Sequence, residues 1–199
     1  MKLKIAQGFT LLETLVAVAI LMIAIGSAFG LAPQGLMGAR YAKNQTTANY
    51  LAQDALETAR NIRDNSMFFS PDPDNPYSWL SGLTECEGNK WCVVDSVNNI
   101  VTPCPGTGFA PECPPLYTIQ TVDGGVAYGN SPLFSNDPTA KPSIFTRRIN
   151  VVRVINDTVA PGNDDTEALF NVSITWQEGL LRRQAQTSAT LFDWWTTSK

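Results

Sequence analysis

Apolar residues follow one another almost without interruption from Phe9 to Ala32, and Glu13 is the one charged residue among them. An apolar helix of about 20 residues is long enough to cross the hydrocarbon core of a membrane. The run is longer than the apolar region of a secretory signal peptide, and the small residue Gly8 precedes it instead of following it. This pattern predicts a membrane-spanning helix near the amino end of the chain.

The polar and apolar positions change to a helical period over residues 36–65. Small or aliphatic residues recur at spacings of three and four, at Ala48, Leu51, Ala52, Ala55, Ala59 and Ile62. This spacing places them on one face of an α-helix. We expect a second helical segment here, with an apolar stripe that packs against a sheet. On its polar face, Glu57 and Arg60 lie three residues apart and are expected to form a surface ion pair.

Helix-breaking residues lie close to the end of the first apolar run, at Gly26, Gly30, Pro33 and Gly35. A proline inside a helix removes one backbone hydrogen bond and clashes with the preceding turn. One interpretation is a kink or a locally melted stretch. The other is that glycine and proline are simply tolerated in a membrane helix. The sequence supports both interpretations equally.

Residues 143–199 alternate between apolar and polar positions with the period of a β-strand. The apolar positions of the first two strands are Ile149, Val151, Ile155, Phe170, Val172, Ile174 and Trp176. In a third strand, one face consists of Ala185, Thr187, Ala189 and Leu191. Gly179 ends the turn Gln177-Glu178-Gly179, where glycine is able to adopt positive φ. We expect an antiparallel meander of three strands with one buried and one solvated face. Packing of this sheet on the helix stripe predicts an α+β fold.

The region 66–142 is the least regular part of the chain. It contains all four cysteines, Cys86, Cys92, Cys104 and Cys113. None forms the close Cys-x2-Cys pair that is typical of zinc sites. Because the membrane helix places this region outside the cytoplasm, where disulfides persist, we expect two disulfides instead of a zinc site or free thiols. Three connectivities are open, and we prefer Cys86–Cys92 with Cys104–Cys113 because each pair closes a short loop.

Short strands are expected in this region at residues 90–95 and 117–122, between prolines that break any longer element. Four aromatic residues precede them, at Phe68, Phe69, Tyr77 and Trp79. These side chains fit either packing over the helix or a contact patch for a neighbouring subunit or ligand. We favour packing.

The composition argues against catalysis and against nucleic-acid binding. The chain has no His, which removes Ser-His-Asp and Cys-His nucleophilic pairs and the commonest metal ligand. Its net charge is −4 at pH 7, so we expect no basic surface for nucleic acid. The acidic link 156–167 lacks the EF-hand pattern and is interpreted as a solvated hairpin loop instead of a calcium site. We expect no enzyme activity, no cofactor and no metal site.

The amino-terminal residues resemble the signature of type IV prepilins and type II secretion pseudopilins. The match consists of a basic leader, a glycine, a phenylalanine and a Thr-Leu-Leu-Glu run, at Lys2, Lys4, Gly8, Phe9, Thr10, Leu11, Leu12 and Glu13. The resemblance implies that residues 1–8 are a leader peptide, and that a prepilin peptidase cuts between Gly8 and Phe9 and methylates the Phe9 amine. It also implies that the helix 9–35 first anchors the protein in the inner membrane and later packs in a filament. A carboxylate in a bilayer is costly and usually paired, and the resemblance gives Glu13 the Phe9 amine of a neighbouring subunit as its partner.

Two later segments resemble PilV-type minor pilins and the I-type pseudopilin. The first consists of Leu51 and Ala52 with Glu57 and Arg60, and the second is Val-Ser-Ile-Thr-Trp-Gln-Glu-Gly at residues 172–179. We therefore expect a minor pilin or pilin-like subunit of a type IV pilus. The alternatives are a type II secretion pseudopilin and, from another class, a monomeric membrane-anchored extracytoplasmic binding domain. The expected partners are prepilin peptidase, other pilin subunits, the inner-membrane assembly platform and membrane lipid. The expected location is the cytoplasmic membrane, with one span and an extracytoplasmic domain, and then the pilus or cell surface.

Overall fold

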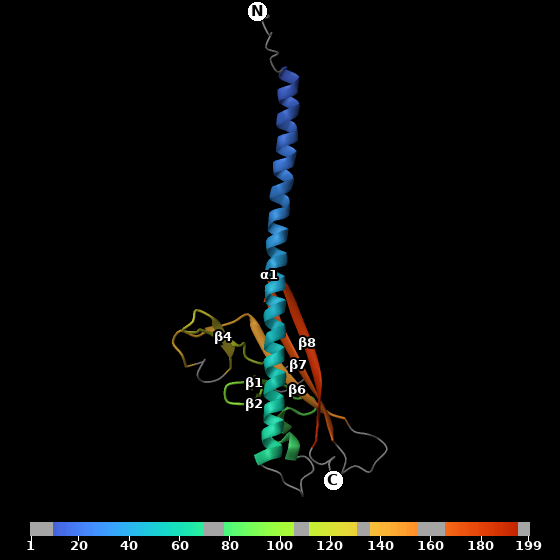
Figure 1. Ribbon diagram of the computed structural model, residues 1–199, viewed down its shortest axis with the longest axis vertical. Coiled ribbons are helices and arrows are strands. Elements are labelled where there is room, and N and C mark those ends of the chain that lie inside the picture. The colour runs from blue at the N-terminus through green and yellow to red at the C-terminus, as the bar shows by residue number, and fades with distance from the viewer. Residues whose placement is uncertain (1–9, 70–77, 106–111, 131–135, 155–165, 195–199) are drawn as a thin grey trace, which may run out of the picture. The chain divides into compact units, whose positions relative to one another are not determined.

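The computed structural model describes residues 10–69, 78–105, 112–130, 136–154 and 166–194. The chain divides into two compact units, Met1–Asn44 and Gln45–Lys199. One helix, α1 (Leu11–Phe69), contributes residues to both units (Figure 1). In the described residues, all strands and two short 3-10 helices belong to the second unit. The chain therefore has the α+β fold that its sequence predicts.

The backbone of α1 is helical throughout the stretch where a kink was considered. Gly26, Gly30, Pro33 and Gly35 all lie inside the helix. The structure thus favours the interpretation that these residues are tolerated within a continuous helix.

The apolar stripe of α1 is buried in the second unit, as its helical period predicts. The core contains all six of its residues, Ala48, Leu51, Ala52, Ala55, Ala59 and Ile62. On the polar face, Glu57 and Arg60 form the predicted ion pair, with Arg60 Nη1 3.5 Å from Glu57 Oε2. Both side chains are exposed, so the pair contributes little to stability.

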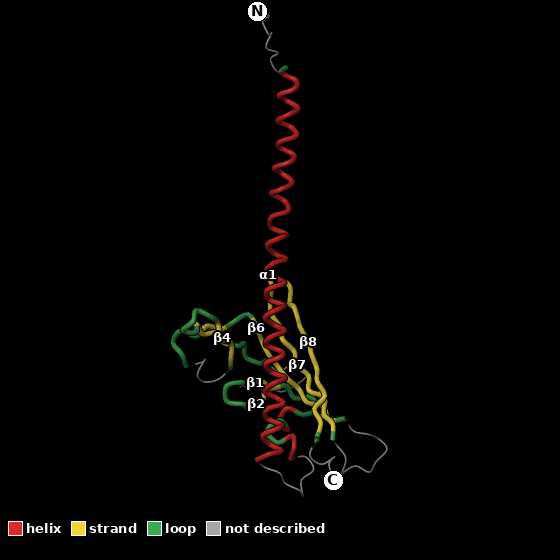
Figure 2. The backbone as a smooth tube through the Cα atoms, in the orientation of Figure 1, coloured by secondary structure: helices red, strands yellow, loops and turns green. Residues whose placement is uncertain are grey.

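The main sheet has five antiparallel strands in the order β2-β1-β6-β7-β8 (Figure 2). These strands are β1 (Cys92–Asp95), β2 (Ile100–Pro103), β6 (Phe145–Arg153), β7 (Glu167–Glu178) and β8 (Leu181–Phe192). The last three form the predicted antiparallel meander. Gln177 and Glu178, predicted in the turn, instead end β7 and pair with Arg182 and Leu181. The turn is therefore Gly179-Leu180, and Gly179 has a φ of 61°. Glycine adopts this left-handed conformation without steric cost.

One face of β7 is buried as predicted, whereas the other is less solvated than the alternation indicates. The core holds the inward set Phe170, Val172, Ile174 and Trp176. Ser173 and Thr175, on the opposite face, are buried as well. Gln184 lies opposite Thr175 in the strand register, and its amide nitrogen donates to Ser173 Oγ at 2.8 Å. A long polar side chain thus covers the middle of this face, and the prediction of a fully solvated face was wrong there.

The region 66–142 contains more regular structure than predicted. The expected strand at 90–95 is β1, and the one at 117–122 is β3 (Tyr117–Gln120). In addition, β3 forms a second antiparallel sheet in the order β4-β3-β5, with β4 (Val126–Gly129) and β5 (Lys141–Pro142). The two 3-10 helices are η1 (Ser78–Leu80) and η2 (Thr84–Cys86).

Two disulfides join Cys86 to Cys92 and Cys104 to Cys113, which are the two pairs expected from the sequence. The first links the end of η2 to the start of β1. The second links the residue after β2 to the segment that leads to β3. Cys86 and Cys92 have no exposed surface, so the first disulfide is part of the core.

The aromatic residues at the end of α1 do not all behave in the same way. Trp79 is 2% exposed and packs in the core, as the favoured interpretation predicts. Phe68 is 60% exposed, and its ring centroid lies 5.6 Å from that of Trp194. Tyr77 and the side chain of Phe69 lie outside the described residues, and so does Ile155 of the predicted strand pattern.

Candidate functional site

The first turn of α1 has a side-chain cap. Thr10 precedes the helix, and its Oγ1 accepts a hydrogen bond from the backbone N–H of Glu13 at 3.3 Å. This contact is one half of a capping box, in which Thr at the cap is followed three residues later by Glu. Glu13 is exposed in the first turn, where a carboxylate interacts favourably with the helix dipole. Gly8 and Phe9, the predicted processing residues, lie outside the described residues.

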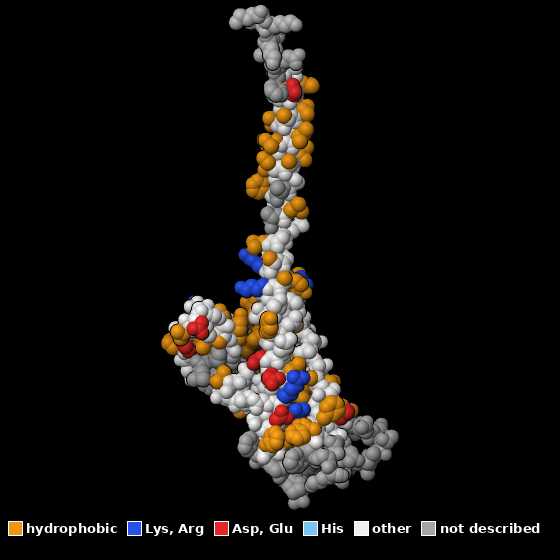
Figure 3. Space-filling model, in the orientation of Figure 1, with side chains coloured by type: hydrophobic (Ala, Val, Ile, Leu, Met, Phe, Trp, Pro, Cys, Tyr) orange, Lys and Arg blue, Asp and Glu red, His pale blue; other side chains and the backbone are white. Residues whose placement is uncertain are grey.

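An exposed apolar surface covers α1 in the first unit. The large apolar side chains from Leu11 to Met37 are between 46% and 83% exposed. A window of 18 residues has a mean hydropathy of 2.5, and none of it is buried. Figure 3 shows these side chains in orange along this part of the helix. Because burial of apolar surface is favourable by about 25 cal/mol per Å², this segment requires lipid or other apolar helices around it.

The length and internal bonding of this segment suit a membrane. No charged residue lies between Glu13 and Arg40. The roughly 26 residues between them extend about 39 Å at the helical rise of 1.5 Å per residue, which exceeds the hydrocarbon thickness of about 30 Å. The hydroxyl of Ser27 donates to the carbonyl of Ala24 at 2.8 Å, so this polar group is satisfied inside the helix, as lipid surroundings demand.

The second unit contains a fully buried arginine, Arg147 of β6, that was not predicted as a structural centre. Its guanidinium is 0% exposed. Nη1 donates to the carbonyl of Leu51 at 3.2 Å and to the carboxylate of Asp54, and Nη2 donates to the carbonyl of Val94 at 3.0 Å. One side chain thus joins α1, β6 and β1.

Asn150 of β6 holds the loop closed by the first disulfide, Cys86–Cys92. Its Nδ2 lies 2.9 Å from the carbonyl oxygen of Lys90 and 3.4 Å from that of Cys86, and it also donates to Gly88. The strand alternation predicts a solvated position for Asn150, but the residue is only 6% exposed. The prediction was wrong because this loop folds over the outer face of β6.

Among the described residues outside the apolar segment, two groups have shifted pKa values. The pKa of Arg148 is lowered by burial and, to a smaller extent, by the positive charge of Arg182. Its guanidinium lies over the ring of Trp91, 4.3 Å from the ring centroid. The pKa of the Asp137 carboxyl is lowered because the hydroxyl and the backbone N–H of Thr139 donate to it, at 2.6 and 2.7 Å.

Among the residues that the structure describes, no three His, Cys, Asp or Glu side chains lie together as a metal site would require. Most of the acidic link 156–167 lies outside those residues, so its predicted conformation as a solvated hairpin loop stays a prediction.

A family model described as the prokaryotic N-terminal methylation motif matches residues 3–29. The match includes Gly8, Phe9 and Glu13, and it extends along the exposed apolar part of α1 as far as Phe29. It supports a processed subunit of the type IV pilin or pseudopilin kind, with a structural role instead of an enzymatic one. Together with the apolar helix, it fits a membrane-anchored protein with a single span. No curated protein and no solved structure matched the chain.

Proposed function

We propose that this chain, which carries the prokaryotic N-terminal methylation motif, is a minor pilin or pilin-like structural subunit of a type IV pilus. The observation that carries this proposal is that the motif coincides with the exposed apolar part of α1. From Leu11 to Phe29, the matched residues therefore also form a helix that needs apolar neighbours. The α+β second unit with its two disulfides agrees with a pilin-like subunit.

Processing prepares the amino end for assembly. Cleavage by prepilin peptidase between Gly8 and Phe9 removes the basic leader and creates an amine four residues before Glu13. The cap of α1 survives this cut, because Thr10 is retained in the mature chain. In lipid, an unpaired carboxylate costs about 2.5–3.5 kcal/mol on insertion scales. A Phe9 amine from a neighbouring subunit would offset that cost and fix the register between two helices.

Membrane lipid and the peptidase are the first partners in this proposal, and other pilin subunits and the inner-membrane assembly platform follow. The second unit is extracytoplasmic, because its disulfides persist outside the reducing cytoplasm. The subunit therefore starts as a single-span protein of the cytoplasmic membrane and ends in a surface fibre.

The test of processing is intact-protein mass spectrometry of the protein purified from its native membranes. We expect a chain that starts at Phe9 and carries one added methyl group. The matched variant Gly8→Glu, which alters only the cleavage site, is expected to start at Met1 and to stay in the membrane. A wild-type chain that starts at Met1, in a cell whose peptidase processes another prepilin, would overturn the proposal and favour a monomeric anchored binding domain.

A type II secretion pseudopilin shares the processing signature, so a second measurement has to separate the two machines. Fibres sheared from the cell surface should contain the mature chain if it is a pilus subunit. A pseudopilin would be absent from sheared fibres, and its deletion would block secretion of a folded exoprotein.

A further inference from the structure

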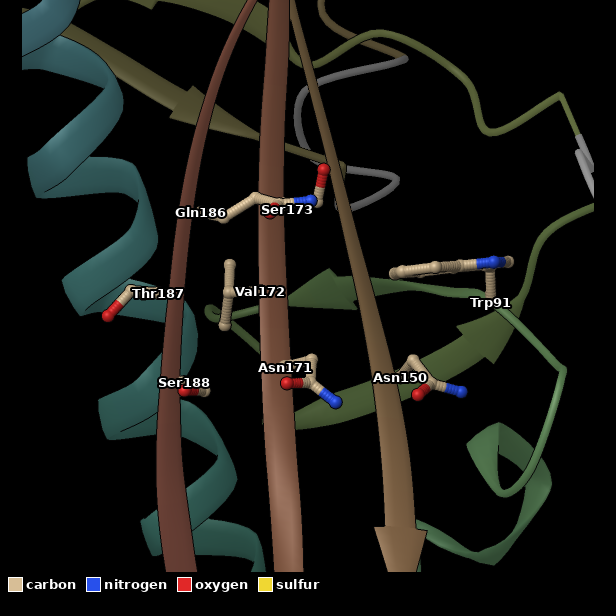
Figure 4. Close-up of a pocket in the computed structure, with 8 residues that line it drawn as sticks. All are labelled: Trp91, Asn150, Asn171, Val172, Ser173, Gln186, Thr187 and Ser188. Atoms are coloured by element: carbon tan, nitrogen blue, oxygen red, sulfur yellow. The ribbon is translucent and has the colours of Figure 1, made fainter.

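A groove of about 370 Å³ lies on the face of the main sheet opposite the core. Figure 4 shows side chains from β6, β7 and β8 in this groove, with the ring of Trp91 on the far side of β6. Its lining includes Trp91, Asn150, Asn171, Ser173, Gln186 and Ser188. The volume falls within the range of about 300–1,000 Å³ that is usual for small-ligand sites.

The strand register arranges these side chains in rows. Asn150 pairs with Asn171, and Asn171 pairs with Ser188, so one row crosses three strands. The next row on the same face consists of Arg148, Ser173 and Gln186. Amide and hydroxyl side chains both donate and accept hydrogen bonds. Asn150 and Ser173 are buried and bonded to the loop carbonyls and to Gln184. The groove therefore presents the donors and acceptors of Asn171, Gln186 and Ser188 on the sheet.

Trp91 forms an aromatic wall whose position is fixed by its neighbours. Its carbonyl accepts a hydrogen bond from the N–H of Cys104 at 2.9 Å, and the next residue, Cys92, is in a disulfide. The Arg148 guanidinium covers the ring at 4.3 Å from the centroid, which is the geometry of a cation–π contact. With the ring held in this way, Trp91 is pre-organised and loses little freedom when a ligand stacks on it.

The lining favours one class of ligand. No Asp, Glu, Lys or Arg lines the groove itself. The nearest cation described above, Arg148, already lies over the ring of Trp91, so the lining gives an ionic ligand no opposite charge of its own. A purely apolar ligand would bury the amides without hydrogen-bond partners, which is costly. A sugar ring has an apolar face of C–H groups and an edge of hydroxyls, which complement an aromatic wall and a row of amides and hydroxyls. We propose that this groove binds a neutral oligosaccharide, with Trp91 stacking on one sugar ring and Asn171 and Gln186 bonding to its hydroxyls.

The experiment uses the full-length protein in lauryldimethylamine oxide micelles, because a detergent with a sugar head group would compete for the site. The probe is a printed array of neutral and acidic oligosaccharides that represent animal surface glycans and fragments of plant and bacterial polysaccharides. We expect binding to one or more neutral structures, and the type bound identifies the source of the ligand. Competition by the same free oligosaccharide should abolish the signal.

Three variants assign the binding to the groove. Trp91→Ala should weaken binding at least tenfold, and the double variant Asn171→Ala with Gln186→Ala should do so without disturbing buried residues. Thr190→Ala is the matched control on the same face of β8, outside the groove, and should bind like the wild type. Binding that survives both groove variants, binding to acidic structures alone, or no binding to any neutral structure would each overturn the proposal.

Discussion

Replacement of Arg147 tests how the second unit is held together. The guanidinium is fully buried and donates to the carbonyls of Leu51 and Val94, at 3.2 and 3.0 Å, and to the carboxylate of Asp54. Truncation to alanine removes every one of these bonds and leaves a cavity in the space of the long side chain. The Asp54 side chain is 45% exposed, so water solvates its carboxylate once the arginine is gone.

The magnitude follows from this difference in burial between the two partners. Breaking a buried ion pair by removing one partner typically costs about 3–5 kcal/mol. Because Asp54 is half exposed, we expect the lower end of that range, about 3 kcal/mol, for Arg147→Ala. Arg147→Met fills most of the same space without a charge to desolvate, so we expect a cost of about 1 kcal/mol. Asp54→Asn leaves the buried charge of Arg147 with only its two carbonyl partners. We expect this variant to cost about 2 kcal/mol, between the costs of the two Arg147 variants.

The assay is urea unfolding of the full-length protein in detergent micelles, followed by near-ultraviolet circular dichroism. Arg60→Ala is the matched control, because it removes an arginine from an exposed ion pair and should change the free energy of unfolding by about 0.5 kcal/mol or less. The reasoning fails if the free energy of unfolding of Arg147→Ala differs from that of the wild type by no more than this control does. It also fails if Arg147→Met is less stable than Arg147→Ala, because filling the space of the side chain would then contribute no stability.

Three other substitutions test separate parts of the chain. Glu13→Gln keeps the size of the side chain and removes its charge, so we expect normal processing and membrane insertion but at least tenfold less protein in sheared fibres; equal recovery in fibres would contradict the pairing of Glu13 with an amine. Asn150→Asp replaces a donor by a carboxylate that faces loop carbonyls, so we expect a loss of about 2–4 kcal/mol at pH 7. This loss should shrink as the pH falls and the new carboxyl is protonated, whereas Asn150→Ala should show no such recovery. The pKa of Asp137 is depressed in the folded state, so its ionised form contributes stability above the ordinary value of 3.8, and that contribution is lost as the pH falls below it. Asp137→Asn should flatten this acid part of the stability profile, and an unchanged profile would show that the bonds from Thr139 are not formed in solution.

The segments with a long regular pattern were predictable from the sequence. The stripe from Ala48 to Ile62 and the strands β6, β7 and β8 repeat their period several times, so hydrophobic burial determines which face points inward. The two disulfides agree with the expected pairs because each closes a local loop, with sequence separations of 6 and 9.

The interactions of Arg147 and Asn150 were not predictable, because their partners lie far along the chain. Arg147 and Asp54 are 93 residues apart, and Asn150 and Lys90 are 60 apart. The alternation does place Arg147 on the inward face of β6, and a charge at an inward position was a signal of a buried ion pair. The additional strands β2, β4 and β5 have four, four and two residues, which is too short for a period to emerge.

The outer face of β6, β7 and β8 carries cations at Arg148 and Arg182, but the groove on this face is lined by uncharged side chains. Exposed faces are commonly rich in charged side chains of both signs, which keep a protein soluble. Here the register instead brings together Asn171, Gln186 and Ser188 beside Trp91. For contact with water alone, charged groups would serve at least as well, and the half-buried indole of Trp91 would serve worse. Uncharged groups that donate and accept at once, beside a fixed aromatic ring, suit a hydroxyl-rich ligand. This argument depends only on the second unit, so it holds for a pilus subunit, for a pseudopilin and for a monomeric anchored domain alike.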